Sequence, residues 1–219
     1  MKQALAGRVA LVAGATGLVG REILAALLAD ETYAQVHAVG RRMLATTHPK
    51  LYSHVVDFAA LPALPAVDDV FIALGTTIKV AGSQRAFRAV DFDAVAALAS
   101  AARAAGATRV GVVSAMGAST SSPIFYNRVK GEMEQAVARL GFDTLVFARP
   151  SLLAGDRESL GQPGRSGEKL ALIALKFAAL IPANYQAIDA SRVARALIHA
   201  VKTSANGTRV LPSGEMQAS

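Results

Sequence analysis

Short runs of consecutive apolar residues alternate along this chain with longer segments in which apolar residues recur at helical spacing. The short runs are rich in valine and predict buried strands at 8–14, 34–40, 53–58, 68–75, 109–115 and 143–150. The longer segments predict helices at 17–30, 83–105 and 123–141. Apolar strands that alternate with helices are typical of a parallel sheet covered on both faces. The pattern therefore predicts an α/β fold with a doubly wound parallel sheet.

The chain after residue 150 has a different character. It begins with a stretch rich in Gly, Ser and Pro, which predicts a loop. Two helices, at 168–181 and 189–202, and a late strand, TRVLPS, are predicted to follow. Because the predicted sheet occupies about residues 8–150, the remainder at 151–219 has room for a small C-terminal cap and not for a separate substrate domain. We therefore predict a single domain over 1–219.

Composition excludes several classes of protein and site. The chain has no cysteine, which excludes disulfides, thiolate metal sites and cysteine nucleophiles and fits a cytoplasmic location. The net charge is +7, but the basic residues are scattered and form no long run, so we expect no nucleic-acid partner. The apolar segment 170–182 is interrupted by Lys176 and ends at Pro182, so it is too short for stable membrane insertion. We expect that segment to pack within a monomer or across a homodimer.

Three glycines stand at the first predicted strand-to-helix turn. Gly14, Gly17 and Gly20 are spaced three residues apart in AGATGLVG. The first allows a tight turn, the second lets the backbone approach a pyrophosphate, and the third lets the helix lie close to the strand. A plain structural turn is the alternative, but the position between a strand and a helix favours a dinucleotide site. The residues expected at this site are Gly14, Thr16, Gly17, Leu18, Val19 and Gly20.

The ends of the next strands predict the type of dinucleotide. The second strand ends in Arg41 and Arg42, where NAD binders usually have an acid for the ribose hydroxyl. Two cations suit a 2′-phosphate, so NADP(H) is preferred over NAD(H), although a solvated arginine pair is the alternative. Asp57 either accepts from the adenine amino group or caps a turn. Leu74, Gly75 and Thr76 close the fourth strand and are expected to line the cofactor site.

A tyrosine and a lysine lie one helical turn apart in the stretch FYNRVKGE. Tyr126 and Lys130 fall on a predicted helix that starts at the carboxyl edge of the sheet, where ligands bind in this architecture. On many helices such a pair is only an aromatic ring packed under a lysine stem. At this edge, however, a neighbouring ammonium and an oxidised nicotinamide would favour the phenolate of Tyr126. The pair therefore predicts an acid–base group for a substrate oxygen.

Four stretches together resemble a known family. AGATGLVG, LGTTIKVAGSQRAFRAVDFD, SSPIFYNRVKGEMEQ and FARPSLLAGDRE are similar to atypical short-chain dehydrogenase/reductases, and more narrowly to the Tat-interacting protein-like branch and its bacterial relatives. The resemblance extends from about residue 8 to about residue 200. It implies a Rossmann fold, NADP(H) binding and a Tyr-x-x-x-Lys pair at Tyr126 and Lys130. It also aligns Arg149 and Pro150 with the Arg-Pro of the family, and implies that the backbone of Ser151 and Leu152 meets the nicotinamide carboxamide.

The sequence departs from the wider family at two positions. Ser114 is followed by alanine and methionine, so the hydroxyl that usually holds the substrate carbonyl stands one position early. It either acts in catalysis or satisfies a backbone group at the strand end. The helix after the fourth strand has Asp91 and Asp93 where the family often has an asparagine in a proton relay.

Three functions are compatible with these features. The first is an NADPH-dependent oxidoreductase that acts on a small carbonyl or sugar-like substrate through Tyr126, Lys130 and Ser114. The second is a non-catalytic, NADP(H)-sensing regulatory protein, because the binding motifs are stronger than the catalytic ones. The third is a nucleoside-diphosphate-sugar epimerase, against which the short C-terminal region argues.

Overall fold

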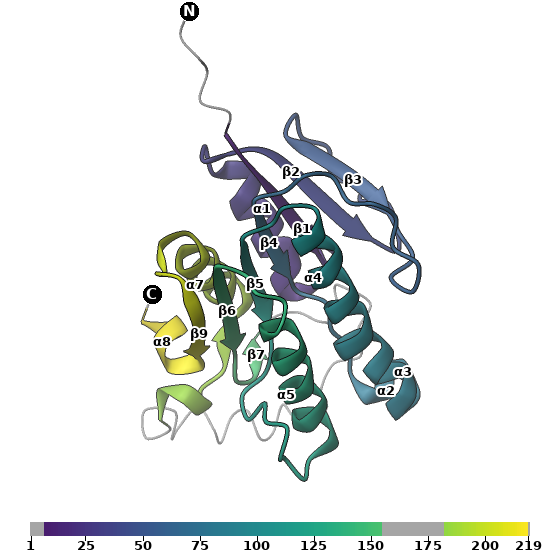
Figure 1. Ribbon diagram of the computed structural model, residues 1–219. Coiled ribbons are helices and arrows are strands. Elements are labelled where there is room, and N and C mark those ends of the chain that lie inside the picture. Colours follow the sequence, from purple (N-terminus) through teal and green to yellow (C-terminus); the bar gives the residue numbers. More distant parts are fainter. Residues whose placement is uncertain (1–6, 155–181, 219) are drawn as a thin grey trace, which may run out of the picture.

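A computed structural model describes residues 7–154 and 182–218 (Figure 1). Its main sheet has seven parallel strands in the order β3-β2-β1-β4-β5-β6-β9. The strands are β1 (Arg8–Ala13), β2 (Tyr33–Gly40), β3 (Leu51–Val55), β4 (Asp69–Ile72), β5 (Arg109–Val113), β6 (Thr144–Arg149) and β9 (Gly207–Pro212). The order reverses between β1 and β4, which confirms the predicted doubly wound α/β architecture.

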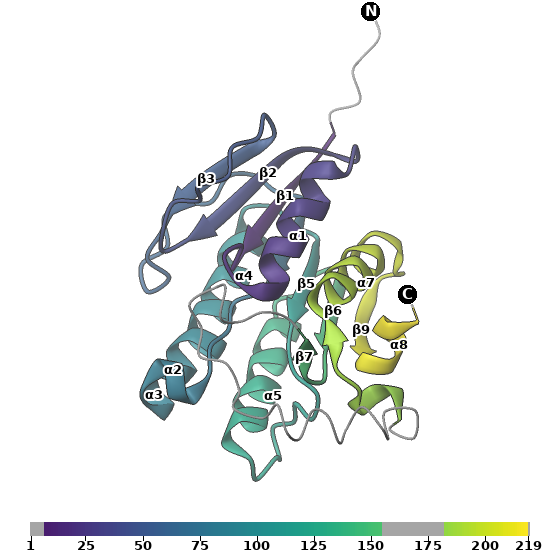
Figure 2. The same cartoon turned by 180° about the vertical axis from the view of Figure 1, so that it is seen from behind.

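Helices cover both faces of this sheet (Figures 1 and 2). The face seen in Figure 2 is covered by α1 (Leu18–Ala29) and α7 (Ala190–Thr203). The opposite face is covered by α4 (Val95–Ala104) and α5 (Phe125–Ala138). Successive residues of β1 enter the two cores in turn, Ala10 and Val12 on the α1 side and Leu11 and Ala13 on the α4 side. The unbroken apolar runs of the strands follow from this two-sided burial.

Short elements fill the connections. They are α2 (Ile78–Ala81), α3 (Gln84–Arg88), the π-helical turn η1 (Ala89–Ala94), the 3₁₀ turn η3 (Ala183–Tyr185) and α8 (Ser213–Gln217). Strands β7 (Leu153–Ala154) and β8 (Ile188–Asp189) form a separate parallel pair. The helix predicted at 83–105 is therefore three consecutive elements, α3, η1 and α4, with a π-helical turn in the middle. The third and fourth strands are shorter than predicted, because the chain leaves the sheet after Val55 and after Ile72.

Strand β9 extends the main sheet, whereas the sequence analysis placed it in the C-terminal cap. It pairs with β6 over six residues, from Thr144 opposite Gly207 to Arg149 opposite Pro212. Helix α7 reaches the sheet at Gly111 of β5, where an added Cβ would lie 2.8 Å from Val201 Cγ2. The late strand and helix are thus part of the same layered core. The other helix and the loop predicted between 155 and 181 lie outside the described residues.

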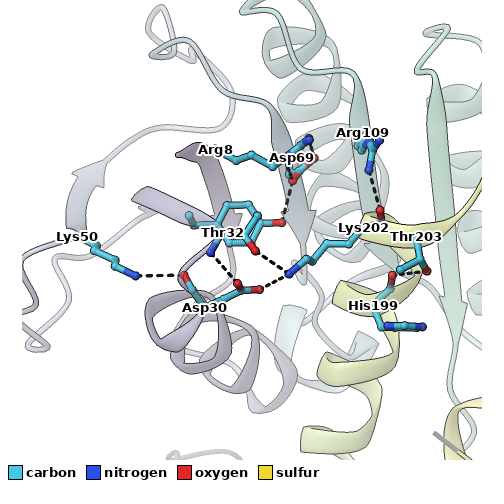
Figure 3. A network of polar contacts seen from close by, with 10 residues as sticks. Arg8, Asp30, Thr32, Lys50, Asp69, Arg109, His199, Lys202 and Thr203 are labelled. Carbon is cyan, nitrogen blue, oxygen red and sulfur yellow. Dashed lines mark hydrogen bonds and ion pairs between the residues drawn. The ribbon is translucent and has the colours of Figure 1, made fainter. Parts of the chain in front are cut away.

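The amino edge of the sheet is held by a network of buried and partly buried polar groups (Figure 3). The carboxylate of Asp69 is fully buried and accepts hydrogen bonds from Arg8 Nε at 2.8 Å and from the Tyr33 hydroxyl at 2.8 Å. Nearby, Lys202 Nζ of α7 lies 2.6 Å from Asp30 Oδ2, at the end of α1. These contacts join β1, β2, β4, α1 and α7 at the end of the molecule opposite the cavity described below.

Candidate functional site

A cavity of about 550 Å³ lies at the carboxyl edge of the sheet, to which the strand arrows of Figure 1 point. Its lining comes from the turns that follow β1, β4, β5 and β6, together with α2, η1 and α5. The lining residues that the sequence analysis singled out are Gly17, Leu18, Val19, Leu74, Gly75, Thr76, Asp91, Ser114, Tyr126, Lys130, Pro150, Ser151 and Leu152. This is the position where ligands bind in open parallel sheets.

The glycine turn after β1 has the backbone geometry of an anion site. Gly14 has a φ of 84°, a conformation that favours glycine, and its carbonyl accepts a hydrogen bond from Gly17 N at 2.9 Å. An added Cβ on Gly20 would lie 1.9 Å from Gly14 O, so only glycine lets α1 approach the turn this closely. The N-cap of α1 is Gly17, which has no side chain to accept from the first-turn N–H groups, and the first turn has no acid. These free N–H groups and the helix dipole suit a phosphate. Gly14, Thr16 and Gly20 form the turn without lining the cavity.

The end of β2 presents two exposed cations. Arg41 and Arg42 directly follow Gly40, and neither has a hydrogen-bond or ion-pair partner among the residues that the structure describes. Asp57 is exposed after β3, where its Oδ1 accepts from Ala59 N at 2.9 Å. This carboxylate therefore caps a turn, which was the alternative that the sequence analysis left open for it.

Asp91 connects two parts of the site, and the sequence analysis missed this role. It lies on η1 and is almost completely buried, whereas Asp93 on the same turn is exposed. Its Oδ1 forms an ion pair with Lys130 Nζ at 2.7 Å, and its Oδ2 accepts from Thr76 N at 2.9 Å. The carboxylate thereby holds the loop after β4 against α5. The available signal was the mixed apolar and acidic stretch VDFD within a helical segment, which did not distinguish the buried acid from the exposed one.

Helix α5 carries the Tyr-x-x-x-Lys pair into the cavity. Tyr126 and Lys130 both line it, and the Tyr126 ring also packs on Phe87 with ring centroids 5.4 Å apart. Gly131 lets the loop after β5 lie against the helix, because an added Cβ would be 2.3 Å from the carbonyl carbon of Ser119.

Two acids that follow Lys130 on α5 hold this helix in place. Glu132 forms an ion pair with Arg88 of α3. Glu134 accepts from Arg149 Nε at 3.0 Å and from a terminal nitrogen of the same guanidinium at 2.5 Å. This hydrogen bonding raises the pKa of Arg149 above its ordinary value. Arg149, expected to bind cofactor, is thus bound to α5 and lies outside the cavity lining.

Ser114 directly follows β5 and lines the cavity. Its side chain is buried, and its Oγ has no hydrogen-bond partner among the described residues. A buried hydroxyl without a partner is costly unless a ligand or water meets it. The sequence analysis allowed that Ser114 satisfies a backbone group at the strand end, and no such contact is present in the described part of the chain. In the neighbouring loop, Ser151 donates to Gln186 O, so that hydroxyl is already used.

Comparisons with known proteins agree with this geometry. A family described as NAD(P)H-binding matches residues 14–170. Protein HTATIP2 of Rattus norvegicus is 35% identical over 207 residues, which cover 90% of this chain and 82% of that protein. The mitochondrial fmp52 protein of Aspergillus fumigatus is 36% identical over 209 residues, which cover 88% of this chain and 86% of that protein.

Solved structures share the fold at low sequence identity. MoeE5 in complex with UDP-glucose and NAD superposes with a TM-score of 0.68 and 19% identity, covering 97% of this chain and 80% of that one. A short chain dehydrogenase family protein from Francisella tularensis gives a TM-score of 0.67 at 12% identity, covering 98% of this chain and 100% of that one.

Two expectations from the sequence are changed by the comparisons. The cytoplasmic location is contradicted, because several fungal relatives are named mitochondrial proteins. The relatives named above come from a rat and a fungus and give no support to a bacterial origin. In the described residues, no helix has the length and apolar character needed to cross a membrane.

The glycine turn and the N–H groups at the start of α1 fit the phosphates of a nicotinamide dinucleotide, and the family match points to the same ligand. The chain therefore belongs to the NAD(P)H-binding family, together with HTATIP2 and the FMP52 proteins.

Proposed function

We propose that this protein is an NADP(H)-dependent oxidoreductase that acts on a small carbonyl compound or the corresponding alcohol. The observation that carries the proposal is the convergence of Tyr126, Lys130 and Ser114 on one cavity beside the glycine turn. Among the described residues, the hydroxyl of Ser114 has no hydrogen-bond partner. A nicotinamide coenzyme held by Gly17, Leu18, Val19 and the loop 74–76 would supply or accept the hydride. Each protein group then has a distinct task.

Tyr126 is the proposed proton donor and acceptor for the substrate oxygen. Ser114 Oγ donates a hydrogen bond to the same oxygen, where negative charge develops during carbonyl reduction. Lys130 provides positive charge one helical turn from the phenol, and this charge is partly compensated by Asp91 at 2.7 Å. Because this ion pair reduces the positive charge that would favour the phenolate of Tyr126, it supports the second candidate, a coenzyme-binding regulatory protein without turnover.

Replacing Tyr126 with Phe separates the two candidates. An oxidoreductase of the proposed type should lose turnover about 100-fold or more, because the acid–base group is gone. The affinity for NADPH should change by less than about twofold, because the ring remains in place. Turnover is measured by the loss of NADPH absorbance, and affinity by the change in NADPH fluorescence on binding. Tyr52→Phe, which removes a hydroxyl from β3, is the matched control and should keep both values.

Equal turnover in Tyr126→Phe and the parent would refute the assigned role of Tyr126. Coenzyme binding without turnover in the parent, across a broad panel of carbonyl compounds, would favour the regulatory candidate.

The preference for NADP(H) is proposed to come from Arg41 and Arg42. Their guanidinium groups are exposed after β2 and free to pair with a 2′-phosphate. The double substitution Arg41→Ala/Arg42→Ala should weaken NADPH binding about 10- to 100-fold and leave NADH binding nearly unchanged, because only NADPH carries that phosphate. Isothermal titration calorimetry with each coenzyme measures the ratio of the NADPH affinity to the NADH affinity. Arg139→Ala, at the exposed end of α5, is the control for loss of a cation, and an unchanged ratio in the double variant would refute the assignment.

A further inference from the structure

The mouth of the cavity gathers exposed apolar side chains. Of the ten large apolar residues that are exposed in the described part of the chain, four line this cavity. Ile78 and Val80 come from α2, Met116 from the loop after β5, and Leu152 from the loop after β6. Exposed apolar side chains are common singly, but a group from three separate segments around one cavity indicates a binding surface.

The polar groups of the lining are mostly engaged by the protein. Among the described residues that line the cavity, the charged ones are Asp91 and Lys130, and they form an ion pair with each other. Thr77 Oγ1 accepts from Val80 N at 3.1 Å, and Ser151 Oγ donates to Gln186 O. In the part of the chain that the structure describes, no group bonds to Ser114 Oγ or to the Tyr126 hydroxyl, and these two groups are enough for one substrate oxygen.

We propose that the substrates are uncharged aldehydes or ketones with an apolar chain or ring, or the matching alcohols. This inference rests on the proposed oxidoreductase function and specifies its substrate. In reduction, the carbonyl carbon gains a hydride from the reduced nicotinamide coenzyme, the π electrons move to the oxygen, and that oxygen takes a proton from Tyr126. The remainder of the substrate lies against Ile78, Val80, Met116 and Leu152. A phosphorylated or carboxylated substrate would need a free cation, and the described lining offers none.

A series of straight-chain aldehydes tests the inference. With NADPH as reductant, kcat/KM should rise from butanal through hexanal and octanal to decanal by about two- to fourfold for each methylene, because each one buries further apolar surface. Succinic semialdehyde and glyceraldehyde 3-phosphate should be poorer substrates than butanal. Better turnover of these anionic compounds would overturn the apolar assignment while leaving the oxidoreductase function intact.

Two substitutions at the mouth link the effect to this surface. Val80→Ser and Met116→Ser should reduce the dependence of kcat/KM on the chain length of the aldehyde, because a hydroxyl replaces the apolar contact. The matched controls are Val55→Ser on β3 and Val210→Ser on β9, since Val55 and Val80 are both 55% exposed and Val210 and Met116 are both 39% exposed. The controls should keep the parental dependence on chain length. An unchanged dependence in the mouth variants would overturn the inference.

Two further measurements distinguish the possible failures. Val80→Ser and Met116→Ser should leave the melting temperature of the ligand-free protein within the range of the two controls. A clear decrease would show that another part of the chain covers these residues, and would overturn the inference.

If no aldehyde is turned over, titration of the NADPH complex with 1-decanol gives a separate readout. Saturable binding that both mouth variants weaken would support the apolar ligand class although the oxidoreductase function had failed. Absence of binding would overturn the apolar assignment.

Discussion

At the scale of single residues, Asp91 and Lys130 form a buried ion pair within the site. Both side chains are almost fully buried, with 1% and 4% of their surface exposed. Two charges removed from water depend on each other, so removing one leaves the other without compensation. The pair also holds the loop after β4, through the bond from Thr76 N to Asp91 Oδ2. Stability and site geometry therefore depend on the same carboxylate.

Replacing Asp91 with Ala should lower the free energy of unfolding by about 3–5 kcal/mol, because Lys130 would remain as an unpaired buried cation. Urea denaturation at neutral pH measures this change. Asp93→Ala, at the exposed position on the same turn, should stay within about 0.5 kcal/mol of the parent. Adding Lys130→Met to Asp91→Ala should restore part of the loss, with a coupling energy of about 1–3 kcal/mol. Equal losses in Asp91→Ala and Asp93→Ala would show that the ion pair contributes nothing.

At the scale of elements, the contact between α1 and the glycine turn after β1 depends on Gly20. Its substitution by Ala would place a methyl group 1.9 Å from Gly14 O, so the helix would have to shift. We expect a loss of about 1–3 kcal/mol in unfolding free energy from this overpacking, together with weaker coenzyme binding because the N–H groups of α1 would move.

Gly17→Ala is the matched comparison. Its Cβ would lie 3.3 Å from Gly14 O, so the free energy of unfolding should change less, while coenzyme affinity should still fall because Gly17 lines the cavity. Denaturation and fluorescence titration of both variants measure the two effects separately. Similar stability losses in the two variants would contradict the assigned role of Gly20.

The elements also show which parts of the molecule the sequence could predict. Apolar runs predicted strands β1, β2, β5 and β6 well, because strands buried on both faces must be apolar throughout. The glycine spacing predicted the turn after β1 for a similar reason, since backbone contact there excludes any side chain. Strand β9 was assigned to a cap, because its residues are mostly exposed at the edge of the sheet and carry little pattern.

The partners of charged residues could not be predicted in the same way. Asp91 meets Lys130, and Glu134 meets Arg149, only because α5 lies beside η1 and β6 in the folded chain. Each acid is one of several in its segment, and nothing in the local sequence distinguishes the buried one. The predicted role of Arg149 in cofactor binding rested on resemblance alone, and its geometry assigns the guanidinium to Glu134.

At the scale of the whole molecule, contacts at the amino edge of the sheet hold α1 and α7 together (Figure 3). Lys202 of α7 contacts Asp30 Oδ2 at 2.6 Å, across 172 residues of sequence, and Thr32 Oγ1 at 3.0 Å, across 170 residues. Arg109 of β5 donates to Lys202 O at 2.9 Å, which ties the same end of α7 to the sheet. Helix α7 is thereby held at the end of the molecule opposite the cavity, independently of the site.

This contact predicts a specific dependence of stability on pH. Partial burial would raise the pKa of Asp30, but hydrogen bonds from Lys202 and Thr32 outweigh it and lower the pKa from 3.8 to about 2. Because the pKa is lower in the folded state, the carboxylate stabilises the fold above about pH 4, and this contribution is lost as the pH falls from 3.8 towards 2. Asp30 is partly exposed, so we expect about 1 kcal/mol. Asp30→Asn should therefore be less stable than the parent by about this amount near neutral pH, and the difference should shrink as the pH falls and vanish only below the folded-state pKa of about 2. Urea denaturation across this range, with the exposed Asp93→Asn as control, measures the difference. A gap between parent and Asp30→Asn that is independent of pH would mean that the charge of Asp30 does not hold α7 to α1.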